Sequence, residues 1–441
     1  KTLMIILRTV KNISSLNIAA SVLLFLAAIL AAVVANSSLS PVYQDFLLQE
    51  LHLRIGNFNL FSHGGHPLKM IEFINDCLMT VFFLAVGLEI KRELLVGELS
   101  SVRKAALPFI AACGGMVVPV VIYALSVASS TPETRGMAIP MATDIAFSLG
   151  VLSLLGKRVP LSLKIFLTAF AVVDDIGGIL VIALFYSADV AYGYLIAAAV
   201  LYVFLYYMGK FGVTQKIFFL FFGVIIWYLF LQSGIHSTIS GVILAFVIPA
   251  RPRLDAGKYI ERIRDIIGEF PVSKSDNIVL TNAQIATLKQ VERASDYVIS
   301  PLQSLEDNLH GAVSFVILPL FAFANAGVVF SGSGSIVGDV SIAVAAGLLL
   351  GKFLGIYLFT WLAVKSGVAL MPAGMNWKNI AGVSLLGGIG FTVSLFIANL
   401  SFADEYPELL NQAKFGVLVG TVLAGVLGYV VLNWVLPKRE K

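Results

Sequence analysis

Five ionisable side chains lie deep inside long apolar runs of this 441-residue sequence: Asp76, Asp144, Asp174, Asp175 and Lys352. A charge at the centre of a membrane costs at least ~2.5–3.5 kcal/mol, so each of these groups needs a partner, water or a bound ion. Four acids and one base leave excess negative charge, which bound metal ions or protons can balance. Asp76 lies only one or two turns into its run, where a structural or cavity-lining role is the simpler interpretation.

Asp174 and Asp175 are neighbours in the segment AVVDDIGG. Adjacent side chains of a helix diverge by about 100°, so the two carboxylates should play different roles. Two like charges ~4 Å apart at an effective dielectric of ~20 repel by roughly 4 kcal/mol, which favours protonation of one of them. Such a group can exchange a proton for a cation near physiological pH. The next glycines, Gly177 and Gly178, predict the close approach of another backbone.

Two apolar segments have features that interrupt helices. Pro140 precedes Thr143 and Asp144 in AIPMATDIAFSLG, and three glycines occur in LLGGIGFTVSLF. Residues 145–149 and 389–393 resemble each other, and their offset predicts an inverted repeat. Interrupted helices in corresponding halves indicate a transporter's substrate site. Half-helix ends carry partial charges, which Asp144 and Lys352 can offset. Lys352 is either a structural counter-ion to one aspartate or a group that releases its proton when a cation arrives.

The elements that must position these residues are membrane-spanning helices. The sequence is 58% hydrophobic and 13% charged, whereas an average soluble domain is about 25% charged. Runs of about 20 apolar residues are typical of membrane spans. We therefore predict an all-α polytopic protein with spans centred on 17–35, 70–90, 105–126, 138–155, 162–186, 191–209, 217–232, 234–250, 309–330, 338–364, 380–402 and 415–436.

The distribution of basic residues predicts the topology. Lys and Arg concentrate in both tails and in alternate loops, which places both termini in the cytoplasm. Because the basic residues are dispersed, the net charge of +4 does not indicate nucleic-acid binding. No phosphate loop, nucleophile triad or metal cluster appears, so we expect neither an enzyme nor a resident cofactor.

The chain divides into residues 1–250, a charged cytoplasmic insertion at 251–307, and residues 308–441. Alternating residues on both sides of Gly56-Asn57 predict an extracytoplasmic β-hairpin over 51–62, either a packed loop or an interaction arm. The insertion shows helical spacing from Tyr259 to Phe270 and a possible capping box at 281–284. It is either a regulatory element or a solvated amphipathic linker.

Several motifs together resemble the NhaA-type sodium/proton antiporters: ATDIAFSLG, AVVDDIGG, FINDCLMTVFFLAVGLEIKREL, SGIHSTISGV, ILPLFAFANAGV, GKFLG and GGIGFTVSLFIA. The resemblance covers nearly the whole chain except 251–300. It implies twelve helices, an inverted repeat that relates helices 3–5 to helices 10–12, and broken helices 4 and 11 that cross. It also implies pH-regulated, electrogenic exchange of cytoplasmic Na⁺ or Li⁺ for external H⁺ in a bacterial inner membrane, and a homodimer through the 51–62 hairpin.

The resemblance also assigns roles to the residues of the site. Asp175 would be the principal cation ligand, and Asp174 either a second ligand and proton carrier or the partner of Lys352. Thr143 and Asp144 would lie at the helix crossing, with Asp144 compensating helix dipoles and possibly binding the ion. Asp76 would lie near the outer funnel.

Residues matching the family's pH-responsive positions are Glu89, Arg92, Glu93, His236, Glu306 and His310. For His236 a hydrogen-bonded packing role is the alternative. The chain departs from better-known members by its long insertion and by Asp307, where they carry another histidine. Two rivals are a sodium-coupled symporter of an organic solute, for which the spans lack a surplus of polar side chains, and a membrane scaffold, which leaves the buried charges unexplained.

Overall fold

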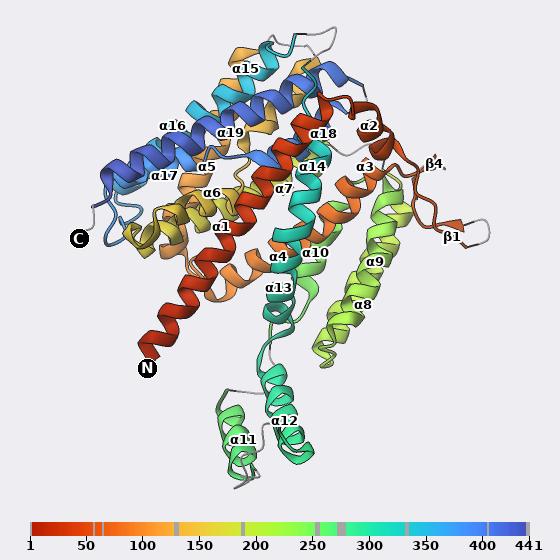
Figure 1. Ribbon diagram of the computed structural model, residues 1–441, viewed down its shortest axis with the longest axis vertical. Coiled ribbons are helices and arrows are strands. Elements are labelled where there is room, and N and C mark those ends of the chain that lie inside the picture. The colour runs from red at the N-terminus through yellow and green to blue at the C-terminus, as the bar shows by residue number, and fades with distance from the viewer. Residues whose placement is uncertain are drawn as a thin grey trace.

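The computed structural model describes residues 2–55, 58–63, 66–127, 132–186, 190–251, 256–270, 279–330, 335–403 and 405–437. These residues are almost entirely helical (Figure 1). Nine described helices are long and apolar enough to cross a membrane. They comprise Ile18–Ala35 of α1 (Thr2–Ala35), Met70–Val96 (α3, η1 and α4), α5 (Val102–Ser126), α7 (Leu161–Phe185), α8 (Tyr192–Lys210), α9 (Lys216–Ser233), Pro301–Asn325 (α13, η4 and α14), Asp339–Lys365 (α15, η5 and α16) and α19 (Pro407–Val435).

Two further pairs of helices pass the same test only together, because each pair is bent by 44° at a short break. The first pair is η2 (Pro132–Met141) and α6 (Ile145–Leu154), and the second is α17 (Trp377–Leu386) and α18 (Phe391–Phe402). Both breaks fall where the sequence predicts interrupted helices. Pro140 lies inside the 3₁₀ helix η2, where it cannot supply a backbone donor. The apolar helix α10 (Thr238–Val247) is shorter than the other spans.

Three of the continuous segments contain a π-helical turn: η1 (Ile74–Leu78), η4 (Val313–Ile317) and η5 (Gly347–Gly351). They join α3 (Met70–Phe73) to α4 (Met79–Val96), α13 (Pro301–Ala312) to α14 (Leu318–Asn325), and α15 (Asp339–Ala346) to α16 (Lys352–Lys365). π-turns are rare and concentrate at functional sites. Here η1 contains Asp76 and η5 ends immediately before Lys352.

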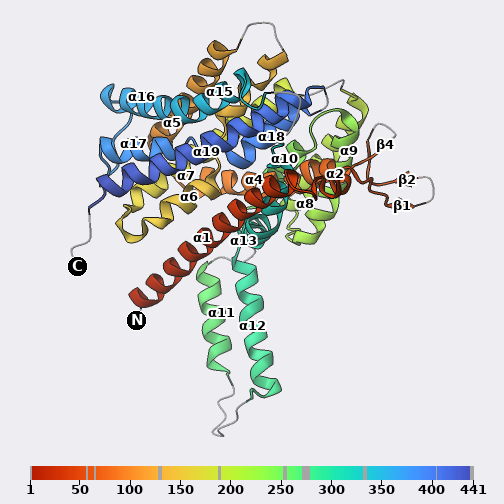
Figure 2. The ribbon, with the colours of Figure 1, turned by 45° about the horizontal axis from the view of Figure 1, so that its top comes forward.

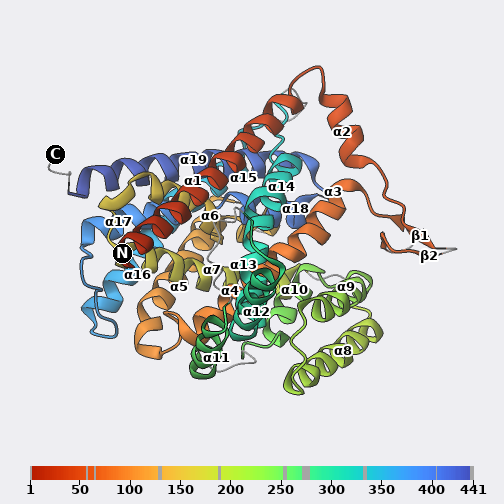
Figure 3. The ribbon, with the colours of Figure 1, turned by 60° about the horizontal axis from the view of Figure 1, so that its bottom comes forward.

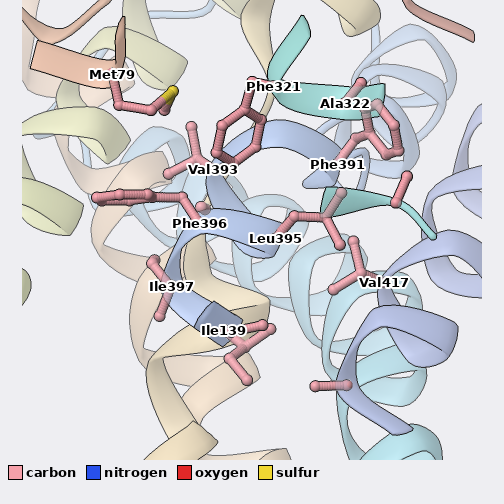
Figure 4. Close-up of a cluster of buried hydrophobic side chains, with 14 of the residues drawn as sticks. Met79, Ile139, Phe321, Ala322, Phe391, Val393, Leu395, Phe396, Ile397 and Val417 are labelled. Atoms are coloured by element: carbon pink, nitrogen blue, oxygen red, sulfur yellow. The ribbon is translucent and has the colours of Figure 1, made fainter. Parts of the chain in front are cut away.

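Close backbone contacts fix how the bundle packs. A Cβ atom added at Gly355 of α16 would collide with the backbone of Gly114 in α5, and the converse is also true. On the other side of the bundle, a Cβ atom at Gly87 of α4 would lie 2.8 Å from the Cβ atom of Ala245 in α10. A large apolar cluster surrounds α18, the second helix of the bent pair α17 and α18. Phe396 and Leu395 of α18 belong to this cluster together with Phe321 of α14 (Figure 4). The bent helices are thus held inside the bundle.

Two small parts project from the bundle (Figures 1 and 2). After α2 (Ser40–Leu48), strand β1 (Arg54–Ile55) pairs antiparallel with β2 (Phe58–Asn59), where the sequence predicts a hairpin, and β3 (Ser62–His63) pairs with β4 (His66–Pro67), which it does not predict. Helices α11 (Ala256–Gly268) and α12 (Asn282–Val298) form the other projection. The predicted capping box is confirmed by hydrogen bonds from Thr281 N to Gln284 Oε1 (2.9 Å) and from Gln284 N to Thr281 Oγ1 (3.3 Å).

Candidate functional site

A buried ion pair joins α7 to the segment that follows η5. Lys352 Nζ donates a hydrogen bond to Asp174 Oδ2, and both side chains are completely buried. The same Oδ2 atom lies 2.7 Å from Thr143 Oγ1, and this hydroxyl also lies 2.8 Å from the Gly387 carbonyl oxygen. Asp174 Oδ1 has no hydrogen-bond partner among the described residues. Oδ2 of Asp174 is therefore hydrogen-bonded twice, whereas Oδ1 is buried without a hydrogen bond among the described residues. A buried acceptor without a hydrogen bond costs folding free energy.

Glycines let the helix carrying Lys352 approach its neighbours. A Cβ atom added at Gly347 would lie 2.7 Å from Pro140 Cβ, and one added at Gly351 would lie 2.6 Å from Pro119 Cα. The prediction for Gly177 and Gly178 is wrong: the side chain of Met116, rather than a backbone, covers Gly177, and nothing lies within 4 Å of a Cβ atom at Gly178. The physical reason is that α5 carries a long flexible methionine at this level, which fills the space that the glycine leaves.

Asp144 connects the two bent helix pairs. It is the N-cap of α6, accepting a hydrogen bond from Phe147 N at 3.0 Å. Its other oxygen accepts bonds from Thr392 N (3.2 Å) and Thr392 Oγ1 (2.6 Å) in the first turn of α18. Helix N-termini carry unpaired N–H groups and partial positive charge. One buried carboxylate therefore accepts hydrogen bonds at the N-terminal ends of both half-helices, and the dipole role that the resemblance implies for it stays a prediction.

Hydroxyl groups add further links between the same elements. Ser148 Oγ of α6 donates to the Leu386 carbonyl oxygen at 3.0 Å, and Ser394 Oγ of α18 donates to the Ile139 carbonyl oxygen at 2.7 Å. The second helix of each bent pair thus donates a hydrogen bond to a carbonyl group beside the break of the other pair. Sequence reasoning missed these serines and Thr392, although the similarity of residues 145–149 to 389–393 carried the signal for Ser148 and Thr392.

Asp175, unlike its neighbour Asp174, meets open space. Its side chain lines a cavity of about 300 Å³ together with Thr143, Asp144 and Thr392. Among the described residues it makes no side-chain hydrogen bond. Asp174 is absent from the lining, so the two adjacent carboxylates have different surroundings, as their divergence on the helix predicts. The lining residues of the cavity come from α1, α4, α6, α7, α13, η4, α14 and α18. Figure 3 shows α4, α7 and α13 near one another in the middle of the bundle.

The same cavity is lined farther out by four of the residues that match pH-responsive positions, Glu89, Arg92, Glu306 and His310. Arg92 Nε lies 2.8 Å from Glu306 Oε1, and Arg92 Nη1 lies 2.8 Å from Oε1 of Glu93, which does not line the cavity. The Arg92 side chain is 32% exposed, in contrast to the buried carboxylates deeper in the cavity. One continuous space therefore links a partly exposed charge cluster on α4 and α13 to Asp175.

Two predicted residues lie apart from this cavity. His236 lies in the turn between α9 and α10, and the adjacent Ser237 directs its Oγ toward Asp76 Oδ1 at 3.4 Å. Neither Asp76 nor His236 lines either of the two large cavities found among the described residues. The funnel role of Asp76 and the pH role of His236 remain predictions.

The chemistry of the site suits a hard monovalent cation or protons. Carboxylate and hydroxyl oxygens are the available donors around Asp175, and hard cations prefer such ligands. No group of three or more His, Cys, Asp or Glu side chains in the described part of the chain is arranged to hold a metal ion.

Comparisons with known proteins agree with each other. The family model described as Na+/H+ antiporter 1 matches residues 11–432. A Na(+)/H(+) antiporter NhaA from Bacteroides fragilis is 75% identical over 437 residues, covering 99% of this chain and 100% of that protein. A Na(+)/H(+) antiporter NhaA from Bacteroides thetaiotaomicron is 74% identical over 438 residues, covering 99% and 100%. One from Parabacteroides distasonis is 50% identical over 448 residues, covering 100% and 99%.

Proposed function

Because the chain belongs to the Na⁺/H⁺ antiporter 1 family, we propose that it exchanges cytoplasmic Na⁺ or Li⁺ for external H⁺ at Asp175. The observation that carries the proposal is that Asp175 is only 6% exposed, faces a cavity of about 300 Å³ and makes no side-chain hydrogen bond among the described residues. A buried carboxylate of this kind needs a bound proton or a cation. Competition between the two for one group is the basis of exchange.

Asp174 and Lys352 form the second part of the mechanism. A buried ion pair is stable only while both partners keep their charges. Cation binding at the neighbouring Asp175 adds positive charge beside Lys352 and favours release of its proton. Asp174, whose second oxygen lacks a hydrogen-bond partner, is then available as a further ligand. In this scheme Thr143 and Asp144 orient the site from the broken helix, with Asp144 also able to approach the ion.

Alternating access follows from the two bent helix pairs. We count α10 and the two bent pairs as spans beside the nine long helices, which gives the twelve spans that the sequence predicts. Helices 4 and 11 cross at their breaks, and helices 3–5 and 10–12 form an inverted repeat. The hydrogen bonds of Asp144 to both pairs support movement of the two breaks as one unit. This unit rocks against the other helices to expose Asp175 to each side in turn.

The exchange is electrogenic in this proposal. Two protons entering for each Na⁺ that leaves carry one net charge, worth ~2.3 kcal/mol per 100 mV of membrane potential. The negative interior of the cell would then drive Na⁺ extrusion. Flux measured at several imposed potentials tests this stoichiometry, since a rate independent of voltage would exclude it.

Regulation by pH is assigned to the charge cluster that lines the outer part of the cavity. The ion pair between Arg92 and Glu306 joins α4 to α13, so a change of protonation in this cluster alters how these two helices pack beside the ion path. His310 contributes to the same lining, and we assign His236 to the response as well.

We place the protein in a bacterial inner membrane with both termini in the cytoplasm, in agreement with the basic loops and with the bacterial relatives. It forms a homodimer through the 51–62 hairpin in this proposal. The rival sodium-coupled symporter is disfavoured because the cavity, at about 300 Å³, is at the lower limit for organic ligands and carries charged groups at both ends.

The proposal is tested in vesicles that carry a fluorescent dye sensitive to ΔpH. Addition of Na⁺ is expected to dequench the dye with the wild-type protein and not with Asp175→Asn. A matched control is Asp45→Asn, an exposed aspartate of α2 remote from the cavity, which should respond like the wild type. Equal responses of Asp175→Asn and the wild type would show that Asp175 is not the cation ligand. Dequenching that requires an added organic solute would favour the symporter.

A further inference from the structure

A second, larger cavity opens on the membrane-facing side of the bundle. Its volume is about 1040 Å³, and its walls come from α5, η2, α7 and the end of α18. Apolar residues on its lining are partly open to the surroundings, including Val117 (53% exposed), Leu180 (56%) and Phe185 (77%). Both α5 and α7 are apolar enough to cross a membrane. In a bilayer the opening therefore faces lipid tails.

Polar residues of this groove are confined to one end. Arg135 and Thr134 begin η2 there, while Tyr186 and Ser401 lie at the ends of α7 and α18. Hydrogen bonds from Tyr186 Oη to the Arg135 carbonyl oxygen (2.7 Å) and from Ser401 Oγ to Tyr186 Oη (3.1 Å) show that these residues cluster. The other lining residues are apolar or glycine. The groove thus has one polar end and an apolar body.

The charge at the polar end is a partly exposed guanidinium group. Arg135 Nη1 lies 2.8 Å from Glu405 Oε2, and its side chain is 52% exposed. The guanidinium carbon also lies 5.4 Å from the centre of the Tyr406 ring. A guanidinium group has five N–H donors, and the contact with Glu405 uses only one nitrogen. Arginine binds phosphate oxygens well, often through two parallel hydrogen bonds. The remaining N–H donors of Arg135 can therefore bind phosphate oxygens at this end of the groove, beside the Glu405 carboxylate.

The length of the groove matches half a bilayer. Along α7 the lining extends from Gly177 to Tyr186, which at ~1.5 Å per residue is about 13 Å. Half of a hydrocarbon core of ~30 Å is about 15 Å. Gly177, with the side chain of Met116 over it, lies at the inner end of this distance. One acyl chain of a single leaflet can therefore extend from the polar end to the inner end of the groove at Gly177, which we call its floor.

We propose that this groove binds one phospholipid, with an acyl chain along α5 and α7 and its phosphate at Arg135. The floor at Gly177 is two residues beyond Asp175 on the same helix. The bound chain therefore fills the membrane-facing space at the level of the buried carboxylates and excludes water on that side. The site differs from the charged cavity that reaches Asp175, because the two share no lining residue.

The test maps bound lipid on the full-length protein in nanodiscs of phosphatidylethanolamine and phosphatidylglycerol. A diazirine at the end of the acyl chain is expected to label Met116 and Met141, and a diazirine next to the glycerol to label η2 near Thr134 and the end of α7. Labelling that is independent of diazirine position, or no stronger than on exposed α8, would show annular lipid only and would overturn the proposal.

Substitutions that fill the groove provide the second arm. Native mass spectrometry of the delipidated wild-type protein is expected to show one tightly held lipid per protomer. Val120→Phe with Val181→Phe should abolish it. The control adds the same volume to exposed positions on α8, Val200→Phe with Val203→Phe, and should keep this lipid. Undiminished lipid in the filled variant would refute the proposal, as would loss of dimers instead of lipid, which would assign the groove to a second copy of the chain.

The phosphate contact is tested separately. Arg135→Gln should reduce lipid retention several-fold, whereas Glu405→Gln breaks the same ion pair but keeps the cation and should retain the lipid. Equal losses in both variants would mean that the ion pair, not a lipid phosphate, accounts for the effect. Neither readout requires transport, so failure here is distinguishable from failure of the proposed exchange function.

Discussion

Replacing Lys352 by methionine would isolate the energetic role of the buried pair. Lys352→Met keeps the length of the side chain but leaves Asp174 without a counter-charge in a site where both side chains are completely buried. Removal of one partner of such a pair costs about 3–5 kcal/mol, whereas replacing both partners is often nearly neutral. Unfolding entropy of ~2.1 cal/mol/K per residue over 441 residues is about 0.9 kcal/mol/K, so we expect Tm to fall by about 3–5 °C.

The assay is thermal unfolding of the purified protein in one detergent, for a full double-mutant cycle. Asp174→Asn should lose a similar amount, and Asp174→Asn with Lys352→Met should recover most of the loss. Lys365→Met is the control on the same helix, where only a contact with the Trp361 ring at 4.4 Å is removed, so a loss of about 1 kcal/mol or less is expected. If the two single losses simply add in the double variant, the pair is not energetically coupled and the reasoning is refuted.

Substitutions at three further positions test how the helices pack. Asp144→Ala removes an acceptor shared by two helix N-termini, and we expect a stability loss of about 2–4 kcal/mol by thermal unfolding; Asp144→Asn keeps an acceptor and should lose roughly half as much. Gly355→Val would overlap the backbone of Gly114, so the yield of monodisperse protein in size-exclusion chromatography should fall sharply, and normal yield would contradict the close approach. Arg158→Gln should cost about 1 kcal/mol, because the half-buried Arg158 donates to the Asn433, Leu436 and Pro437 carbonyl oxygens at the end of α19; no change in Tm would show that solvent replaces these bonds.

The sequence was sufficient to predict the burial of four charged side chains, Asp144, Asp174, Asp175 and Lys352, and the positions of both helix breaks, because both features are expensive in a membrane and are visible as exceptions to apolar composition. Asp76 is only half-buried. Asp174, Asp175 and Lys352 indeed lie on neighbouring helices, and both bends occur at the segments with Pro140 and the glycines near 388. The adjacent carboxylates also differ in their surroundings, as helix geometry requires.

Other features depend on pairings that no local pattern specifies. Which acid would meet Lys352 was left open, because helix periodicity gives directions around an axis and not the identity of the neighbour. The hydrogen bonds among Asn75, Asn325 and Asn399 join three separate helices and follow from packing at long range. The prediction for Gly177 was wrong for the same reason: a glycine shows that space is needed but not what fills it, which here is Met116.

The most direct test of the central claim, that Na⁺ and H⁺ compete for Asp175, is proton release from the purified protein in weakly buffered detergent solution. Adding NaCl to the deionised wild-type protein should acidify the solution, choline chloride should not, and the signal should disappear in Asp175→Asn. Equal proton release from Asp175→Asn and the wild type would contradict the account.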